Sequence, residues 1–542
     1  MADTMEMIDQ SDISLLYPDA DSLRRHSLGE DIARLSHETE EQLELSCLMD
    51  LKSCDFGSFY TSDPEVILYR QETFADMMAN PSLIGILHKM IPFLNDITEL
   101  RRMGSDSAAS TEAYLYSITE VELYTSLLEL LQTQLLPLAP NFKSAAFRKF
   151  AERINILTGS EYYRNLNDEL KELTSRVREI KSITIGVNLD AQLRAERAGV
   201  LSINNDHFKS GELLDKMLRL NFKNDDMTCI APLVSFRKGQ SDNQQAALSN
   251  AFNGAINDVF KSSVRSWKKV IQLYVLENTD FLIRMMPEIE FVTKGTELLL
   301  KLKEAGCTLC NPVIEPMTEK TFRTKGLCNP IVTLKLNAPV VPNDFRFDED
   351  GMIYVLTGPN RGGKSVITCA VGIAFVMAQL GLPVCADECT ISPTDAIYTH
   401  FPTGSEDTID KGRLGEECSR LGTIFEQVTE DSLVLLDESL SSTGSYEGAY
   451  IASEVLQGFS LVRCRGIFCT HLHDLAASVD SINETCLAKG GVKIDNLVAA
   501  IEEGSRSFKI KRMKPDGKSY ARDIAEKYGL SIDKILKKIQ TK

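Results

Sequence analysis

The stretch Gly358-Pro-Asn-Arg-Gly-Gly-Lys-Ser365 constrains the fold most, because glycines before a Lys-Ser pair at this spacing are typical of a phosphate-binding loop. Before it, Met352-Ile-Tyr-Val-Leu-Thr357 is mostly apolar and β-prone, which predicts a buried parallel strand. After it, residues 366–380 are apolar and are followed by Gly381 and Pro383, which predicts a helix that ends there. Strand, glycine-rich turn and helix in this order form the context that such a loop requires.

Each residue type in this loop has an expected part in holding phosphate. Glycines let backbone N–H groups point inward at phosphate oxygens, and the N-terminus of the following helix adds partial positive charge. Lys364 is expected to reach the β- and γ-phosphates, and the Ser365 hydroxyl to hold Mg²⁺. The predicted nucleotide-binding residues are Gly358, Pro359, Asn360, Arg361, Gly362, Gly363, Lys364, Ser365 and Val366.

A second part of the site is predicted at Asp431-Ser-Leu-Val-Leu-Leu-Asp-Glu438, an apolar strand that ends in two carboxylates. Asp437 is placed to bind Mg²⁺, and Glu438 to polarise the water that attacks the γ-phosphate. An edge strand with a solvated acidic end is the alternative interpretation. A third strand, residues 466–470, leads into His471, which either senses the γ-phosphate or makes only structural hydrogen bonds. Glu438, Lys364 and His471 are the predicted catalytic residues.

These motifs together resemble the ATPase domain of a known family. Three motifs occur in the order typical of the MutS family, over about residues 330–530. They are the phosphate loop, the strand ending in Glu438 with Ser441-Ser-Thr-Gly-Ser-Tyr-Glu-Gly448 after it, and Phe468-Cys-Thr-His-Leu-His-Asp-Leu475. The resemblance implies an α/β P-loop ATPase domain of the ABC type, preceded by a mostly α-helical core and lever domain with a small β insertion. It also implies ATP and Mg²⁺ as cofactors, a homodimer, DNA as the load, and other repair proteins as partners.

The sequence departs from the family pattern in four places. Arg361 stands where the family usually has Met, and the segment Lys411–Glu416 has Leu414 and Gly415 where the family has hydroxyl side chains that contact the partner subunit's nucleotide. Near Val340 the family commonly supplies an aromatic ring that stacks on adenine, whereas this sequence has only aliphatic side chains. The mismatch-reading domain is expected to be absent, because the core-like segment begins within the first hundred residues.

Three domains are expected along the chain. They are the start of a helical core at residues 1–110, a helical lever at 111–325 with a β insertion near 183–203, and the ATPase domain at 326–542. The lever contains a coiled-coil-like seam at Leu166, Leu170, Leu173, Val177 and Ile180, and a similar spacing from Phe260 to Tyr274. Alternating apolar residues predict strands at residues 183–189 and 200–203. A helical dimerisation stalk is the alternative to moving levers.

Composition bears on where the protein acts. The sequence has no uninterrupted run of 18 apolar residues and no secretory signal, so no membrane contact is expected and the cytoplasm is the expected location. Thirteen cysteines, an odd number scattered among apolar runs, fit reduced thiols. Cys307-x-x-Cys310 with Cys328 leaves a zinc site open as an alternative, although a fourth ligand at a convincing spacing is missing.

The net charge of −18 means that any contact with DNA must be local, because Lys and Arg make the phosphate contacts that dominate affinity. Residues 505–542 hold 12 Lys/Arg and 4 Asp/Glu, a net charge of +8. The end of this segment, from Tyr520, predicts two helices around a Gly529 turn. The resemblance assigns this helix-turn-helix-like end to subunit pairing, and a DNA-reading helix pair is the alternative.

The function expected from all these features is an ATP-driven, dimeric conformational switch that binds DNA by structure rather than by mismatch, in repair or recombination. Two other classes stay open at this point. One is an ATPase that remodels or senses a protein or RNA partner, favoured by the acidic charge. The other is a nucleotide-binding scaffold with weak hydrolysis, favoured by Leu414 and Gly415.

Overall fold

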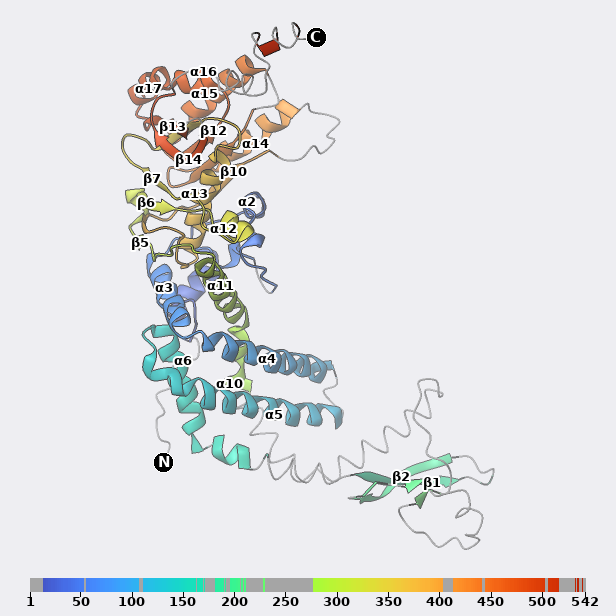
Figure 1. Ribbon diagram of the computed structural model, residues 1–542. Coiled ribbons are helices and arrows are strands. Elements are labelled where there is room, and N and C mark those ends of the chain that lie inside the picture. Colours follow the sequence, from blue (N-terminus) through green and yellow to red (C-terminus); the bar gives the residue numbers. More distant parts are fainter. Residues whose placement is uncertain are drawn as a thin grey trace. The chain divides into compact units, whose positions relative to one another are not determined.

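The chain forms two compact units. The computed structural model describes residues 13–52, 55–106, 111–161, 163–168, 170, 181–189, 191, 195–204, 206–207, 209–210, 228–229, 276–402, 413–440, 444–502, 505–515, 532, 534–535 and 539. Unit 1 comprises Met1–Ile84, Lys143–Phe147 and Pro287–Lys542, and unit 2 comprises Gly85–Phe142 and Arg148–Met286. Figure 1 labels the helices and strands of both units. Among the described residues, no helix has the length and apolar character that crossing a membrane requires.

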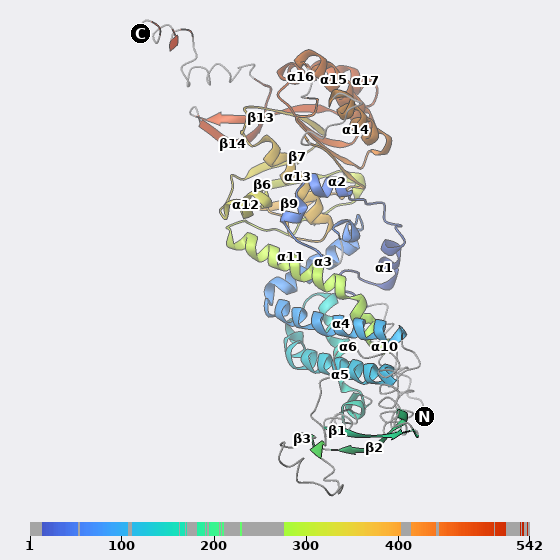
Figure 2. The same cartoon turned by 90° about the vertical axis from the view of Figure 1, so that its right-hand side faces the viewer.

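The centre of unit 1 is a six-stranded sheet with the strand order β10-β11-β12-β8-β13-β14. Its strands are β8 (Ile353–Thr357), β10 (Ile397–His400), β11 (Leu433–Asp437), β12 (Arg465–Cys469), β13 (Ile494–Glu502) and β14 (Ser505–Arg512). All neighbours pair in parallel except β13 and β14, which form the antiparallel hairpin seen at one edge in Figure 2. The carboxyl ends of β11, β12 and β8 therefore lie side by side.

Two helical layers cover this sheet, because alternate residues of a strand face opposite sides. Val434 and Leu436 of β11 belong to a buried cluster that includes residues of four helices, α14 (Arg413–Gln427), α15 (Ser445–Val462), α16 (His473–Ala477) and α17 (Val479–Ala488). Leu435 lies between them and faces Gly372 of α13 (Lys364–Gln379), where an added Cβ would be 2.7 Å from Leu435 Cδ1. The sheet is thus enclosed, which explains why every residue of β8, β11 and β12 is buried.

Helix α13 also packs on a second sheet, of four strands in the order β5-β9-β6-β7. Its strands are β5 (Val313–Ile314), β6 (Phe322–Leu327), β7 (Asn343–Phe347) and β9 (Glu388–Ile391). The rings of Phe322 on β6 and Phe375 on α13 stack with centroids 4.7 Å apart. Between β6 and β7 the chain forms α12 (Pro330–Leu336), whose N-terminus is capped by the Asn329 side chain.

The remaining helices of unit 1 come from its N-terminal part and from the segment before the second sheet. They are α1 (Ala20–Ser27), α2 (His37–Gln42), α3 (Pro64–Ala79) and α11 (Met286–Glu304), with 3₁₀ turns at Leu45–Cys47, Gly57–Phe59 and Met317–Glu319. Glu288 Oε2 accepts hydrogen bonds from the Ser14 hydroxyl at 2.8 Å and from the Leu15 N–H at 2.7 Å. Arg70, which is fully buried, donates to the carbonyl of Leu16. These bonds fix the first described residues onto α3 and α11.

Unit 2 is built mainly from long helices. It contains most of α4 (Ser82–Asp106) and α6 (Ala145–Gly159), the helices α5 (Thr111–Gln134) and α10 (Leu276–Arg284), and a 3₁₀ turn at Leu136–Asn141. Arg101 of α4 links two other helices, because its guanidinium bonds Glu120 of α5 at 2.6 Å and Asp280 of α10 at 2.5 Å. Lys89 of α4 bonds Gln134 at the other end of α5, so α4 and α5 are antiparallel.

The two strands expected near residues 183–203 are present as an antiparallel pair. They are β1 (Ser182–Leu189) and β2 (Ala195–Asn204), with Ser182 opposite Asn204. Two further short strands, β3 (Lys209–Ser210) and β4 (Thr228–Cys229), pair in parallel. Most of the expected seam, from residue 173 to 180, and all of residues 260–274 lie outside the described part of the chain.

Candidate nucleotide site

The phosphate loop connects β8 to α13, and its backbone conformation requires glycine. Gly358 has φ +140° and Gly363 has φ +96°, both in the region that other residues avoid. A Cβ on Gly358 would also lie 2.7 Å from the Cβ of Ala499 on β13, so a side chain there would collide with the neighbouring strand. The non-glycine residue Arg361 has φ +60° and an exposed side chain. The loop residues are therefore held with their backbone wrapped around the start of α13.

Lys364 is the first residue of α13 and is only 5% exposed. Its ammonium group donates to the carbonyl oxygens of Gly358 at 3.3 Å and Pro359 at 3.4 Å, so the loop itself holds the charge in place. Burial lowers the pKa of Lys364, while the nearby carboxylates of Glu438 and Asp437 favour its charged form. A phosphate group would supply the negative charge that this buried ammonium needs.

Asp437 ends β11 next to the loop and fits a divalent cation. The residue is 8% exposed, and its Oδ1 has no hydrogen-bond partner among the described residues. Burial raises the pKa of the Asp437 carboxyl, which a hydrogen bond with Ser365 opposes. A buried carboxylate oxygen without a partner beside a hydroxyl is a suitable donor set for Mg²⁺, which prefers oxygen ligands. Ser365 and Asp437 thus lie together, as the sequence predicts for the metal ligands.

Glu438 follows Asp437 with φ +50°, a strained conformation for a residue with a side chain. Its Oε1 lies 2.8 Å from His471 Nε2, and both side chains are 40% exposed. The same His471 nitrogen is 3.4 Å from Lys364 Nζ. One nitrogen cannot both donate to a carboxylate and accept from an ammonium, so we assign the shorter contact, His471 donating to Glu438, as the hydrogen bond. The three predicted catalytic side chains thus form one group.

A further histidine beside this group was not predicted from the sequence. His400 ends β10, next to β11, and is 2% exposed. Its Nδ1 lies 2.7 Å from the hydroxyl of Ser439, which in turn donates to the His400 carbonyl oxygen. Burial lowers the pKa of His400 to about 4, so the ring is neutral near pH 7. The pair fixes the backbone directly after Glu438, and only the pairing of β10 with β11 brings it together.

The segment Lys411–Glu416, expected to face the partner subunit's nucleotide, is described from residue 413 onward. Leu414, expected in place of a nucleotide-contacting hydroxyl, lies in the first turn of α14, where its partly buried side chain packs against the cluster between the sheet and α14–α17. An apolar side chain is more stable there than in water, which accounts for a leucine at this position. Three sets of residues lie outside the described part of the chain: 411–412 of this segment, 441–443 of the motif after Glu438, and 516–531 of the expected C-terminal helices.

The cysteines show no arrangement for zinc in the part of the chain that the structure describes. No group of three or more His, Cys, Asp or Glu side chains there could hold a metal ion. The Cys328 thiol donates a hydrogen bond to the Gly326 carbonyl oxygen, with Sγ 3.5 Å from that oxygen. Burial raises the pKa of the Cys310 thiol to about 11. Protonated thiols are poor metal ligands, because the thiolate is the form that binds.

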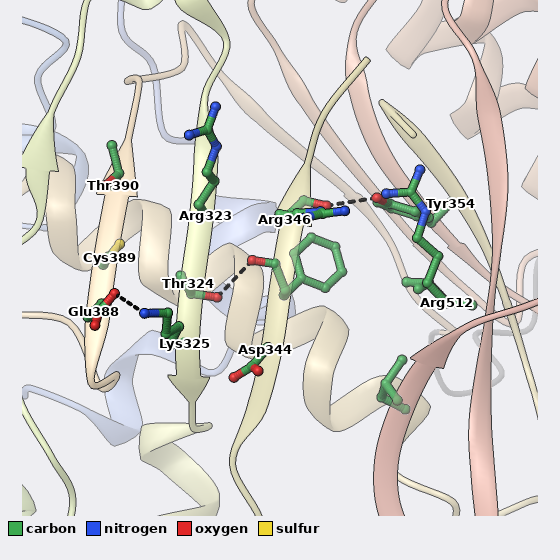
Figure 3. A pocket seen from close by; sticks show the side chains of 13 residues that line it. Arg323, Thr324, Lys325, Asp344, Arg346, Tyr354, Glu388, Cys389, Thr390 and Arg512 are labelled. Atoms are coloured by element: carbon green, nitrogen blue, oxygen red, sulfur yellow. Dashed lines mark hydrogen bonds and ion pairs between the residues drawn. The ribbon is translucent and has the colours of Figure 1, made fainter. Parts of the chain in front are cut away.

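A separate cavity of about 500 Å³ opens on the outer face of the second sheet. Figure 3 shows its lining side chains on β9, β6 and β7 and on the β13–β14 hairpin. Lys325 is paired with Glu388 at 2.7 Å, and Arg346 and Arg512 share Asp348. Carboxylates thus already neutralise these three cations, whereas Arg323 also lines the cavity, which contains no residue of the phosphate loop.

Comparison with known proteins agrees with this geometry. Two family models match the chain, "MutS domain V" over residues 354–538 and "MutS2 N-terminal domain" over residues 62–305. Together these matches extend over most of both units. They place the chain in the MutS family.

Individual relatives cover less of the chain. A DNA mismatch repair protein MutS from Chloroflexus aurantiacus is 32% identical over 222 residues, which is 39% of this chain and 22% of the relative. DNA mismatch repair protein MSH7 from Arabidopsis thaliana is 28% identical over 49% of this chain and 26% of its own length. A MutS from Prochlorococcus marinus is 25% identical over 56% of this chain and 33% of its own length. The matched segments are thus no more than a third of these three relatives.

Proposed function

We propose that this chain binds ATP with Mg²⁺ and hydrolyses it. The observation that supports the proposal is that Lys364, Asp437 and Glu438 meet at one edge of the central sheet, with the Lys364 ammonium buried and the Asp437 Oδ1 unpartnered among the described residues. A buried cation next to a loop of turned backbone amides fits a polyphosphate. Membership of the MutS family, whose relatives described above are named as DNA mismatch repair proteins, supports the same chemistry.

Each of these residues has a role that its surroundings make specific. Ser365 and Asp437 would hold the Mg²⁺, which supplies positive charge to the phosphates when bound. The Lys364 ammonium exchanges its contacts with the Gly358 and Pro359 carbonyls for phosphate oxygens. Glu438 orients the attacking water and accepts its proton, for which its hydrogen bond with His471 must open. The released His471 can then donate to the γ-phosphate.

Equilibrium binding and turnover of two variants test this proposal. Lys364→Ala should lose tight ATP binding, because it removes a phosphate contact, whereas Lys335→Ala, an exposed lysine in an ion pair, is the matched control and should bind normally. Glu438→Gln should bind ATP as the wild type does and hydrolyse it about 10²- to 10⁴-fold more slowly. Equal ATP affinity of the wild type and Lys364→Ala would exclude the site assignment.

We further infer that nucleotide binding closes a homodimer and is coupled to DNA binding in repair or recombination. The basic residues of the C-terminal segment, within a chain of net charge −18, support a local rather than an extended DNA contact. The antiparallel pair of α4 and α5, joined at Arg101, supports a rigid helical arm that contacts duplex shape rather than single bases. The cysteines with described side chains are free thiols, which favours the cytoplasm.

Fluorescence anisotropy tests the DNA part of the proposal. Labelled branched, mismatched and fully paired duplexes should be titrated at several salt concentrations, with and without ATP. We expect the branched DNA to bind most tightly and the mismatched and paired duplexes to bind alike. A tenfold preference for one mismatch, about 1.4 kcal/mol, would show mismatch reading instead. If DNA does not stimulate turnover, a protein or RNA partner becomes the load, and absent turnover with intact ATP binding indicates a scaffold.

A further inference from the structure

The cavity on the outer face of the second sheet, of about 500 Å³, has the size of a small-molecule site. Strands β9, β6 and β7 form its floor, and the β13–β14 hairpin forms a wall (Figure 3). Alternate residues of β6 and β7 are exposed on this face, and the residues between them are buried beneath it. A ligand in the cavity therefore meets polar and charged side chains on its floor: Arg323, Lys325, Asp344, Arg346, Glu388 and Thr390.

Two arginines lie directly opposite each other on this floor. Arg323 of β6 pairs with Arg346 of β7 in the antiparallel ladder, and both side chains are exposed on the cavity face. Like charges at such a position repel each other and destabilise the pairing of the strands. On the other side of Arg323, β9 places Thr390 opposite it. One row across three strands thus presents two guanidinium groups and a hydroxyl to the cavity.

The charges of the two arginines are neutralised to different extents. Arg346 contacts Asp348 through its Nε at 2.7 Å, and Arg512 contacts the same carboxylate at 2.9 Å. The side chain of Arg323 has no hydrogen bond or ion pair with any residue that the structure describes. An anion between the two arginines would pair with Arg323. It would also accept hydrogen bonds from the terminal nitrogens of Arg346, because a guanidinium has five N–H donors.

The hairpin wall is joined to the floor and to the central sheet. Asn343, at the start of β7, donates through Nδ2 to the Phe508 carbonyl at 3.2 Å and accepts at Oδ1 from the Ile510 N–H at 2.8 Å. The hydroxyl of Tyr354 on β8 donates to the Arg346 carbonyl at 2.8 Å. The cavity is therefore formed in the absence of a ligand, so binding loses little conformational freedom of the chain.

We propose that this cavity binds a small phosphorylated molecule, with its phosphate at the row of Thr390, Arg323 and Arg346. The number of donors favours phosphate over a carboxylate, because one arginine fork already satisfies both oxygens of a carboxylate. Two forks and a hydroxyl match the three terminal oxygens of a phosphate monoester. Leu497 and Ile510 of the hairpin line the same cavity and give the rest of the ligand an apolar surface to contact.

Chemical modification of arginines tests this site in the full-length wild type. Phenylglyoxal reacts with accessible guanidinium groups, and mass spectrometry of the peptides gives the rate at each arginine. Phenyl phosphate at about ten times its Kd should slow the modification of Arg323 and Arg346 about tenfold, and acetate at the same ionic strength should not. Arg24, an exposed arginine in an ion pair on α1, is the internal control and should react at one rate throughout.

Calorimetric titration with phenyl phosphate measures what Arg323 contributes. The titrations use the Lys364→Ala background, so that the phosphate loop does not take up the probe. Arg323→Gln should weaken binding about tenfold or more, because it removes charge-assisted hydrogen bonds. Arg323→Lys should bind with intermediate affinity, since lysine keeps the charge but not the fork. The matched control is Lys325→Gln/Glu388→Gln, which removes an ion pair of the same floor at constant net charge and should bind as before.

Thermal unfolding separates ligand binding from a structural role of Arg323. Without ligand, Arg323→Gln should melt at or above the temperature of its parent, because it removes the repulsion between β6 and β7. Phenyl phosphate should raise the melting temperature in the Lys364→Ala background and leave it unchanged once Arg323→Gln is added. A lower melting temperature for Arg323→Gln would show that this arginine stabilises the fold, and would contradict the proposal.

A comparison of probes identifies the source of the phosphate. Phenyl phosphate should bind more tightly than inorganic phosphate, because only phenyl phosphate has a ring to pack on the hairpin. Equal affinities, or equal protection of Arg323 and Arg24 by every anion, would overturn the proposal. So would protection of Arg323 by a phosphoserine peptide and not by phenyl phosphate, which would make the occupant a protein segment. These results leave the proposed function untouched, because the phosphate loop contributes no residue to the cavity.

Discussion

Glu288→Gln should make unit 1 more stable at neutral and alkaline pH, and more so as the pH rises. Glu288 is 7% exposed, and burial raises the pKa of its carboxyl from 4.5 to about 7, against the opposing effects of its hydrogen bonds with Ser14 and Leu15 and of the nearby Arg70 charge. Both of these hydrogen bonds end on Oε2, so one carbonyl oxygen satisfies them. A glutamine can provide that oxygen and has the shape of the neutral acid.

The sign and size of the effect follow from proton linkage. A carboxyl whose pKa is higher in the folded chain contributes stability that is fully present below pH 4.5 and is lost as the pH rises to about 7. At about 1.4 kcal/mol for each pH unit, this loss amounts to about 3 kcal/mol. His400 acts in the opposite direction, because its pKa is lowered from 6.5 to about 4 and its contribution is lost as the pH falls through that range. The variant removes only the first effect.

Urea unfolding of the wild type and Glu288→Gln, followed by circular dichroism from pH 4 to 8.5, measures the difference directly. Subtracting the two curves cancels His400 and every other shared group. The gain in unfolding free energy for Glu288→Gln should grow by about 3 kcal/mol between pH 4.5 and pH 7.5 and then stay constant. A flat difference, or one that falls with pH, would show that Glu288 ionises as freely in the folded chain as in the unfolded one.

Two further predictions concern packing. Gly295→Ala should destabilise unit 1 by about 1–3 kcal/mol, because the new Cβ would lie 2.7 Å from the Phe74 ring. Gly85→Ala should stabilise unit 2 by about 0.5–1 kcal/mol, because its new Cβ would have nothing within 4 Å on an exposed turn of α4. Calorimetric melting temperatures that move the same way for both would refute this. Leu414→Ser should lower stability by roughly 1–3 kcal/mol without raising ATP turnover per folded molecule, and a faster turnover would instead place Leu414 at the nucleotide.

The phosphate loop could be located from the sequence because the residues that form it are consecutive in the chain. Strand, glycines, Lys364 and helix are consecutive, and apolar runs before Asp437 and His471 are typical of buried parallel strands. The carboxyl ends of such strands meet whenever the strands are neighbours. Predicting that Lys364, Glu438 and His471 come together therefore requires only the strand order.

Phe508 and His400 could not be located in this way, because their positions depend on pairing between distant segments. His400 reaches Ser439 only because β10 lies next to β11, and Phe508 lies near Gly363 only because the β13–β14 hairpin is placed beside the phosphate loop. The Glu-Gly-Ser turn near residue 504 and the alternation of Phe508 and Ile510 with polar residues are signals that predict the hairpin. They do not predict the bulge, which leaves residues 507–509 of β14 opposite a single residue of β13.

Under the proposed function, the contacts within the candidate nucleotide site suggest why binding and hydrolysis would be separate steps. Lys364 is held by carbonyl oxygens and Glu438 by His471, so neither group is yet in the position in which it acts on a nucleotide. Glu438 also has φ +50°, a conformation that costs about 1–3 kcal/mol and that the hydrogen bond between its N–H and the Cys469 carbonyl helps to hold. Arriving phosphates attract Lys364 directly, because opposite charges meet in a buried place. Glu438 gains nothing from them and is repelled by their charge, so its release depends on His471 turning to the γ-phosphate instead. We therefore expect a triphosphate to free Glu438 to act as the base, and a diphosphate, which offers His471 no such partner, to leave Glu438 bound.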